Sequence, residues 1–254
     1  MCLILLAWHA HPNYPLVIAA NRDEYHARAA APASWWPQPQ ILAGRDLSAG
    51  GTWLALTRDG RFAALTNYRD PSRQLREAPS RGALIPALLS TPLSAAEQLQ
   101  RLQHEGAAYN GFNLIFSDGE QLAIYESVAG TGRLLGPGVY GLSNHLLDTP
   151  WPKVVNAKAA LGAALTRLPD EAPLLELLRD EARPDDVRLP RTGVSQEWER
   201  MLSSAFIRSD TYGTRCSNLV LMNQLGLIRF TEWSWDSAGE LTGQANFSFQ
   251  RATA

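Results

Sequence analysis

The chain has 254 residues, of which 45% are hydrophobic and 19% are charged. This composition is typical of a folded globular protein and excludes the disordered class. The 23 basic and 25 acidic side chains give a formal net charge of −2. No run of like charges forms the basic stripe of a nucleic-acid-binding protein, so that class is excluded too.

The apolar run from Leu3 to Trp8 opens the chain. No basic residue precedes it, and His9, His11 and Pro12 end it early, so a signal peptide is disfavoured. No later apolar run approaches the ~20 residues that span a bilayer. Two cysteines are too few for a disulfide framework and favour a reducing compartment. We therefore expect a cytoplasmic protein without an integral membrane segment.

The first predicted elements are two buried strands, residues 2–8 and 16–20, joined by the turn residues 11–15. Two strands and a short turn make a hairpin. The hairpin brings the charged residues that follow the second strand, Arg22 and Asp23, back beside Cys2.

The middle and end of the chain show further hairpins and short helices. Residues 29–51, rich in Pro, Ala and Gly, are expected to form a long loop held down by Trp35 and Trp36. Asp-Gly pairs at 59–60 and 118–119 are strong hairpin turns. The remaining expected strands cover residues 53–57, 62–66, 112–116, 122–125, 139–142, 218–222, 227–232 and 247–249. The expected helices cover residues 82–89, 95–103, 151–165, 174–178 and 197–202, with Ser94 as N-cap of the second.

Hairpins dominate this order, and no β-α-β alternation occurs. The pattern predicts an α+β fold with antiparallel sheets. Without an internal repeat or a clear linker, we expect one domain over residues 1–254.

Cys2 is the first candidate for chemistry. Removal of Met1 is favoured when residue 2 is small, and the chain would then start with a free α-amine and a thiol on one residue. An α-amine titrates near ~7.7–8.0 and accepts a proton at neutral pH, while a thiolate is a strong nucleophile. The alternative, favoured by position alone, is an ordinary buried cysteine at the start of a strand.

Arg22 and Asp23 strengthen the first interpretation. A guanidinium near a thiol favours the thiolate, and a carboxylate near an α-amine orients it. The alternative is a surface ion pair at the end of a strand, although the segment Asn21-Arg22-Asp23-Glu24 lacks the Gly or Pro of a turn.

Three polar residues near other predicted strand ends are further candidates. Asn67 and Asn144 each end a strand, where a side-chain amide is a suitable oxyanion donor but where turn asparagines are also common. Arg215 supplies a second charge at the site or is a surface arginine. His9 and His11 face the same side of a strand, but two ligands fall short of the usual three or four, so no metal is expected.

Several blocks in order resemble one known family, the transport and Golgi organisation protein 2 family, also called the NRDE family. The blocks are Met1-Cys2, Asn21-Arg22-Asp23-Glu24, Gly50-Gly-Thr-Trp53-Leu, Ala64-Leu-Thr-Asn67-Tyr, Tyr109-Asn-Gly-Phe-Asn-Leu-Ile115, Tyr140-Gly-Leu-Ser-Asn144, Thr149-Pro-Trp-Pro-Lys153 and Tyr212-Gly-Thr-Arg215. They extend over nearly the whole chain.

That family in turn resembles the N-terminal-nucleophile hydrolases of the penicillin V acylase and bile salt hydrolase branch. The resemblance implies a four-layer αββα sandwich of two antiparallel sheets. It implies that Cys2 is the nucleophile, flanked by Arg22 and Asp23. It also places Asn67 and Asn144 at oxyanion or substrate-orienting positions and makes Arg215 a late catalytic arginine.

The leading functional hypothesis is hydrolysis or acyl transfer on a small amide or thioester through Cys2, without a cofactor. The alternative is a non-enzymatic carrier of haem or an acyl lipid that uses the same pocket, because the family has been linked to haem trafficking and to lipid or acyl-CoA homeostasis. No haem signature such as C-x-x-C-H supports that alternative.

Overall fold

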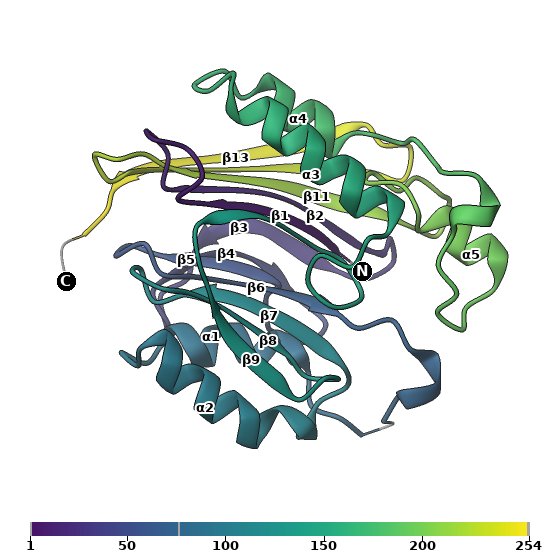
Figure 1. Ribbon diagram of the computed structural model, residues 1–254, viewed down its shortest axis with the longest axis horizontal. Coiled ribbons are helices and arrows are strands. Elements are labelled where there is room, and N and C mark those ends of the chain that lie inside the picture. Colours follow the sequence, from purple (N-terminus) through teal and green to yellow (C-terminus); the bar gives the residue numbers. More distant parts are fainter. Residues whose placement is uncertain (1, 76, 253–254) are drawn as a thin grey trace.

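Two antiparallel sheets stacked face to face form the centre of the computed structural model, which describes residues 2–75 and 77–252 (Figure 1). One sheet has six strands in the order β10-β1-β2-β11-β12-β13, and the other has seven in the order β3 to β9. Helices cover the outer face of each sheet (Figure 1). The predicted α+β class and the αββα sandwich are confirmed.

The strands of the six-stranded sheet are β10 (Gly138–Leu142), β1 (Cys2–Trp8), β2 (Leu16–Tyr25), β11 (Tyr212–Met222), β12 (Leu227–Trp235) and β13 (Leu241–Gln250). Those of the seven-stranded sheet are β3 (Ala30–Trp35), β4 (Ile41–Asp46), β5 (Leu54–Thr57), β6 (Phe62–Asn67), β7 (Phe112–Ser117), β8 (Leu122–Glu126) and β9 (Thr131–Leu135). The α-helices are α1 (Leu84–Leu89), α2 (Ala95–Glu105), α3 (Pro152–Leu165), α4 (Ala172–Leu178) and α5 (Gln196–Met201).

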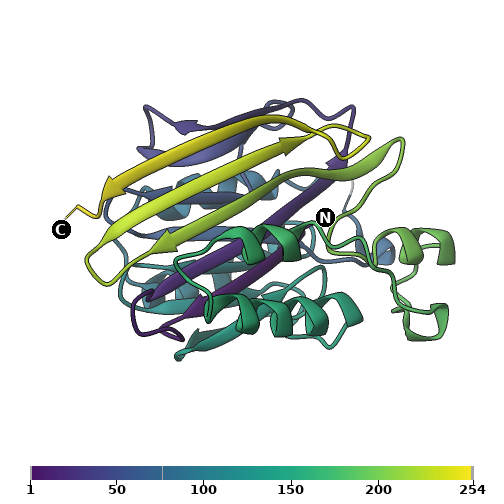
Figure 2. The same ribbon diagram turned by 90° about the horizontal axis from the view of Figure 1, so that it is seen from above.

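Strand β1 is buried on both faces, which explains its unbroken apolar sequence. Ile4 and Leu6 pack between the two sheets. Leu3 and Leu5 pack against α3 and α4 on the outer face, where Figure 2 shows both helices lying across the sheet. The N-terminal strand is thus held from two sides, and its first residue is fixed with it.

Several predicted boundaries are wrong. Residues 29–51 contain the hairpin β3–β4 rather than a long loop, although Trp36 does anchor it by donating from Nε1 to the Ala43 carbonyl at 3.0 Å. Strand β9 was not expected, because it lies at a sheet edge and lacks a buried pattern. Strand β2 continues to Tyr25 and β11 begins at Tyr212, so the charged motifs lie inside strands, not beyond them.

Two predicted helix-start signals agree with the structure. Ser94 caps α2 in a full capping box with Glu97. Pro152 occupies the first turn of α3, where its missing N–H costs nothing. No helix of residues 2–75 and 77–252 is long and apolar enough to cross a bilayer.

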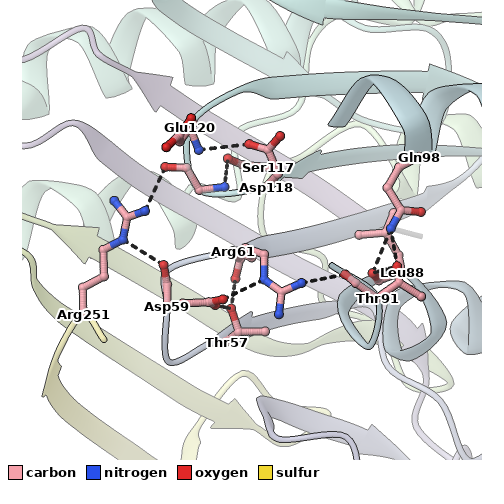
Figure 3. Close-up of polar contacts among 11 residues, drawn as sticks. Thr57, Asp59, Arg61, Leu88, Thr91, Gln98, Ser117, Asp118, Glu120 and Arg251 are labelled. Atoms are coloured by element: carbon pink, nitrogen blue, oxygen red, sulfur yellow. Dashed lines mark hydrogen bonds and ion pairs between the residues drawn. The ribbon is translucent and has the colours of Figure 1, made fainter. Parts of the chain in front are cut away.

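Arg251, just after β13, ties the last strand to the turns of the other sheet (Figure 3). Its Nε donates to the Asp59 carbonyl at 2.8 Å, and its Nη2 donates to the Gly119 carbonyl at 3.2 Å. Gly60 and Gly119 have φ angles of 84° and 98°, as the two predicted Asp-Gly turns require. This clamp lies away from the start of β1.

Candidate active site

A cavity of about 780 Å³ lies between the two sheets and takes its walls from both. Cys2, Arg22 and Cys216 come from the six-stranded sheet, and Asp46 and Asn67 come from the other. The cavity is large enough for a small organic substrate. Its position brings together residues from distant parts of the sequence.

Cys2, Arg22 and Cys216 form a row across three neighbouring strands. Cys2 pairs with Arg22 between β1 and β2, and Arg22 pairs with Cys216 between β2 and β11. Directly paired residues of antiparallel strands point to the same face. The guanidinium therefore lies between two thiols that both line the cavity.

Arg22 keeps unused donor capacity in this row. Its Nη2 lies 3.2 Å from Asp46 Oδ2, and Arg28 Nε binds the same oxygen at 2.6 Å. The buried Nη1 of Arg22 has no hydrogen-bond partner among the described residues. Two cations thus share one carboxylate, and the wall beside Cys2 keeps a positive character.

Asp23 sits on the opposite face of the sheet, because successive residues of a strand alternate. Its Oδ1 accepts a 2.8 Å hydrogen bond from Thr214 Oγ1, and its carbonyl accepts one of 2.9 Å from the Tyr212 hydroxyl. Asn21 shares this face and donates to the carbonyls of Leu178 and Ala205. Asp23 still borders the cavity at the end of the strand. The register pairs Cys2 with Arg22, so Asp23 is the next residue of β2 past that pair, and the charges of both side chains act on the Cys2 thiol.

The electrostatic balance at Cys2 differs from the prediction. Burial raises the pKa of the Cys2 thiol, and the charge of Asp23 raises it further, while the charge of Arg22 and a hydrogen bond from the Asp23 backbone act to lower it. The expected sign of the Arg22 effect is right, but burial outweighs it. Burial also raises the pKa of Asp23 against the lowering effects of Lys153, Thr214 and Arg69.

The two asparagines meet, but only one reaches the cavity. Asn67 lines the wall, whereas Asn144 is fully buried and does not. Asn144 Nδ2 donates to the Asn67 carbonyl at 2.8 Å, and the Asn144 carbonyl accepts from the Arg69 N–H at 2.8 Å. Asn144 therefore fixes the backbone that presents Asn67, and the oxyanion roles of both stay predictions.

Arg215 reaches the cavity through a β-bulge. The pairing of β11 with β2 shifts between Thr214 and Cys216, which leaves Arg215 as the extra residue. Its Nη1 donates to the carbonyls of Tyr25 and Arg28 at 2.9 and 3.0 Å. The structure brings this predicted site residue to the cavity wall.

Several charged residues of the site were missed at the sequence level. Arg28, Asp46, Arg81 and Glu232 all line the cavity. Buried Glu232 accepts from the Ala33 N–H at 2.7 Å and from Asn218 Nδ2 at 3.0 Å, and burial raises its pKa. Its local signal in the sequence is a single carboxylate inside strand β12.

The histidines do not converge on the cavity. Within residues 2–75 and 77–252, no His or Met lines its wall, and no group of three or more His, Cys, Asp or Glu side chains is arranged for a metal ion. The soft donors on the wall are Cys2 and Cys216, whose thiol pKa values burial raises. Haem iron is held by His, Met, Tyr or a Cys thiolate, so these two thiols are the only described side chains on the wall of a haem-ligating type.

The sandwich is similar in fold to the N-terminal-nucleophile hydrolases. A conjugated bile acid hydrolase from Clostridium perfringens superimposes with a TM-score of 0.53 at 8% identity, covering 98% of this chain and 92% of that protein. The match at such low identity concerns the fold alone.

Sequence comparison then identifies the family. The family model described as "Transport and Golgi organisation 2" matches residues 1–237. The Bos taurus transport and Golgi organization protein 2 homolog is 36% identical over 92% of this chain and 93% of its own length. The Homo sapiens homolog is 34% identical over the same shares. The chain belongs to the transport and Golgi organisation 2 family.

Proposed function

We propose that this protein is an N-terminal-nucleophile hydrolase or acyltransferase that acts on a small amide or thioester through Cys2. The observation that carries the proposal is the position of Cys2. It is buried at the start of strand β1, on the cavity wall, and pairs in register with Arg22. The fold shared with a hydrolase supports the reaction class.

In the proposed reaction, removal of Met1 frees the α-amine of Cys2. The amine takes the thiol proton as Sγ attacks the substrate carbonyl. Collapse of the tetrahedral intermediate breaks the C–N or C–S bond, and the ammonium returns the proton to the leaving group. Water, or an acceptor in the transferase case, then releases the acyl group from Sγ. Residue 1 lies outside the described residues, so its removal stays a prediction.

In this proposal, charged residues on the two faces of the six-stranded sheet have different roles. Arg22, with its unpaired Nη1, favours the thiolate and the developing oxyanion on the cavity side. Asp23 orients the amine from the helix side. Asn67, on the wall, is our candidate for a further oxyanion donor. We also place the protein in the cytoplasm, because both cysteines are free thiols.

The test begins with the intact mass of protein purified from cells, which should lack Met1. Wild-type protein is then screened against N-acyl amides and acyl thioesters. We expect turnover that Cys2→Ala lowers by several orders of magnitude and that Cys216→Ala, the matched thiol control in the same cavity, changes less than about threefold.

Two outcomes would reject the proposal. One is uniform retention of Met1, which blocks the amine. The other is hydrolysis that persists in Cys2→Ala. If neither protein hydrolyses any substrate, and both bind haem with the same spectral change, the carrier hypothesis replaces the enzyme.

A further inference from the structure

Three arginines of the cavity wall gather around one carboxylate beside Cys2. Arg22 Nη2 and Arg28 Nε bind Asp46 Oδ2 at 3.2 and 2.6 Å. Arg215 Nη1 donates to the Arg28 carbonyl at 3.0 Å, which joins it to the same group. The three arginines and Asp46 all line the cavity. We call Arg22, Arg28 and Arg215 the arginine cluster.

Asp46 has no acceptor capacity left for a third cation. Its Oδ1 accepts from the backbone N–H groups of Ser48 and Ala49, both at 3.0 Å, and its Oδ2 accepts from Arg22 and Arg28. A carboxylate offers about four acceptor positions, so all of them are used. Burial acts to raise the pKa of Asp46, but the hydrogen bonds from Arg28 and Ala49 hold it below its usual value. The carboxylate is therefore ionised at neutral pH and fully occupied.

Several donors of the arginine cluster lack an acceptor within residues 2–75 and 77–252. Arg22 is 8% exposed, and its buried Nη1 makes no hydrogen bond with a described residue. Arg28 binds Asp46 through Nε, which leaves both of its Nη atoms without a partner in the same part of the chain. Arg215 donates to backbone carbonyls and forms no ion pair with a described carboxylate. A buried donor without an acceptor costs free energy, which an oxygen atom of a ligand would recover.

The other acids of the wall do not supply this acceptor. Glu24 lies on the same face of β2 as Arg22, but its Oε2 is 3.9 Å from Arg28 Nε, beyond hydrogen-bond distance. Its Oε1 accepts from the Tyr25 N–H at 2.9 Å. Glu232, on β12, binds a backbone N–H and an asparagine amide instead of these arginines. Even with Glu24 counted beside Asp46, guanidinium groups outnumber carboxylates, so the cluster keeps a net positive charge.

The arginine cluster lies one strand away from the proposed nucleophile. Cys2 pairs in register with Arg22 between β1 and β2, and neighbouring strands are about 4.8 Å apart. Paired side chains point to the same face, and both residues line the cavity. An anionic group held by the cluster would therefore lie close to the carbonyl that Cys2 attacks.

We propose that the arginine cluster binds a carboxylate of the substrate, next to the bond that Cys2 cleaves. Guanidinium groups hold carboxylates through paired N–H donors, and the free Nη atoms of Arg28 provide such a pair. The substrate class is then an acyl amide whose leaving amine carries a carboxylate close to the nitrogen, as in an N-acyl amino acid. The inference rests on the proposed function and deepens it. A phosphate group has the same chemistry toward arginine, and the experiments below distinguish the two anions.

The first experiment needs no substrate and compares two alkylating reagents of nearly equal size, the anion iodoacetate and the neutral iodoacetamide. The ratio of their rates at Cys2, measured by peptide mapping, reports the charge beside the thiol, because the reactivity and exposure of the thiol cancel. The same ratio at Cys2 in the urea-unfolded chain is the reference. We expect folding to raise the ratio at least about fivefold, since a cationic site attracts the anionic reagent.

Charge variants test whether the arginine cluster causes this preference. Arg28→Gln should lower the ratio of the folded protein at least about threefold, because it removes one cation of the cluster. Arg58→Gln is the matched control and should leave the ratio unchanged, since exposed Arg58 stacks on Trp35 outside the cavity wall. Glu24→Gln removes a competing carboxylate and should raise the ratio, a change that misfolding would not produce. Equal ratios in folded and unfolded wild type, or a ratio that neither Arg28→Gln nor Glu24→Gln changes, overturns the inference.

A second experiment covers the case in which Cys2 is too buried to react with either reagent. Thermal unfolding is followed with N-acetylglycine, with its neutral twin N-acetylglycinamide and with inorganic phosphate, at equal ionic strength. N-acetylglycine should raise the Tm of wild type more than its twin does, and the difference should vanish in Arg28→Gln. Stabilisation by phosphate but not by N-acetylglycine would assign the cluster to phosphate and overturn the carboxylate proposal, as would stabilisation by neither anion.

In active protein, an N-acyl amino acid should be hydrolysed with a kcat/KM at least about tenfold above that of its carboxamide twin. Arg28→Gln should remove this preference, mainly through KM, while Arg58→Gln should keep it. No preference in wild type would overturn the inference. A charge-dependent alkylation ratio in a protein without any hydrolysis would reject only the proposed function.

Discussion

The two cysteines of this chain stand in the same cavity, on either side of the same arginine, yet their surroundings differ. Cys2 opens a strand, and the charges of Asp23 and Arg22 act on its pKa with opposite signs. Cys216 lies inside β11, its Sγ 3.7 Å from Asn218 Oδ1 and close to the carboxylate of Glu232. Burial, followed by Glu232, raises the pKa of Cys216 well above its usual value. Sharing an arginine therefore does not make two thiols equivalent.

The charged neighbours of the two thiols are of two kinds, those shared by both thiols and those that act on one thiol. Arg22 acts on both thiols in the same direction, so it does not distinguish them. Glu232 acts on Cys216, and the residues around the start of β1 act on Cys2. The difference between the thiols thus comes from what lies beyond the arginine.

The largest expected effect is a difference in alkylation rate. At pH 8, Cys2 should react with iodoacetamide at least about tenfold faster than Cys216, because the thiolate is the reactive form. Peptide mapping by mass spectrometry after limited labelling measures both rates in one sample. Equal rates, or a faster Cys216, would remove the basis of the comparison.

A smaller change is expected when Glu232 is neutralised. In Glu232→Gln the pKa of Cys216 should fall, and its alkylation should speed up roughly three- to tenfold, while Cys2 serves as the internal control. The amide also leaves one of the two donors, the Ala33 N–H and Asn218 Nδ2, unsatisfied. We therefore expect a loss of about 1–3 kcal/mol in the free energy of unfolding. Acceleration of both thiols together would point to local opening instead.

The smallest expected effect follows from removing the shared arginine. In Arg22→Gln both thiols should react about two- to fivefold more slowly, because each loses a nearby positive charge. The ratio of the two rates should change little. A variant that slows Cys2 alone would show that Arg22 belongs to that thiol and not to both.

Much of the fold was predictable from local sequence. Asp-Gly pairs fix hairpin turns, and Ser94 with Glu97 defines a helix start, because each signal depends on residues close together. Strands β3 and β9 were not predicted, because neither carries a clear local pattern. Both are edge strands with mixed burial, and Pro32 inside β3 is tolerated only at an edge.

The candidate site was predictable only in part. The row from Cys2 to Arg22 follows from a single hairpin, so the sequence alone indicates it. Strand β2 continues to Tyr25, so the alternation of side chains along it puts Arg22 and Asp23 on opposite faces of the sheet. Because the strand was expected to end at Ala20, both charges were predicted to lie together beside Cys2. Arg28, Asp46 and Glu232 come from three separate segments of the sequence, and no local pattern shows that they line one cavity.

The β-bulge at Arg215 offers a way for the charge of the cavity wall to change by mutation. Thr214 pairs with Asp23 and Cys216 pairs with Arg22, which are themselves neighbours on β2. The ladder would therefore be continuous if Arg215 were absent, with every other side chain on its present face. The strand holds one residue more than its pairing needs, and that residue supplies a cation to the cavity wall. A single-codon insertion or deletion at this point would add or remove a pocket charge without disturbing the register, a route to new ligand preference that ordinary strand positions do not offer.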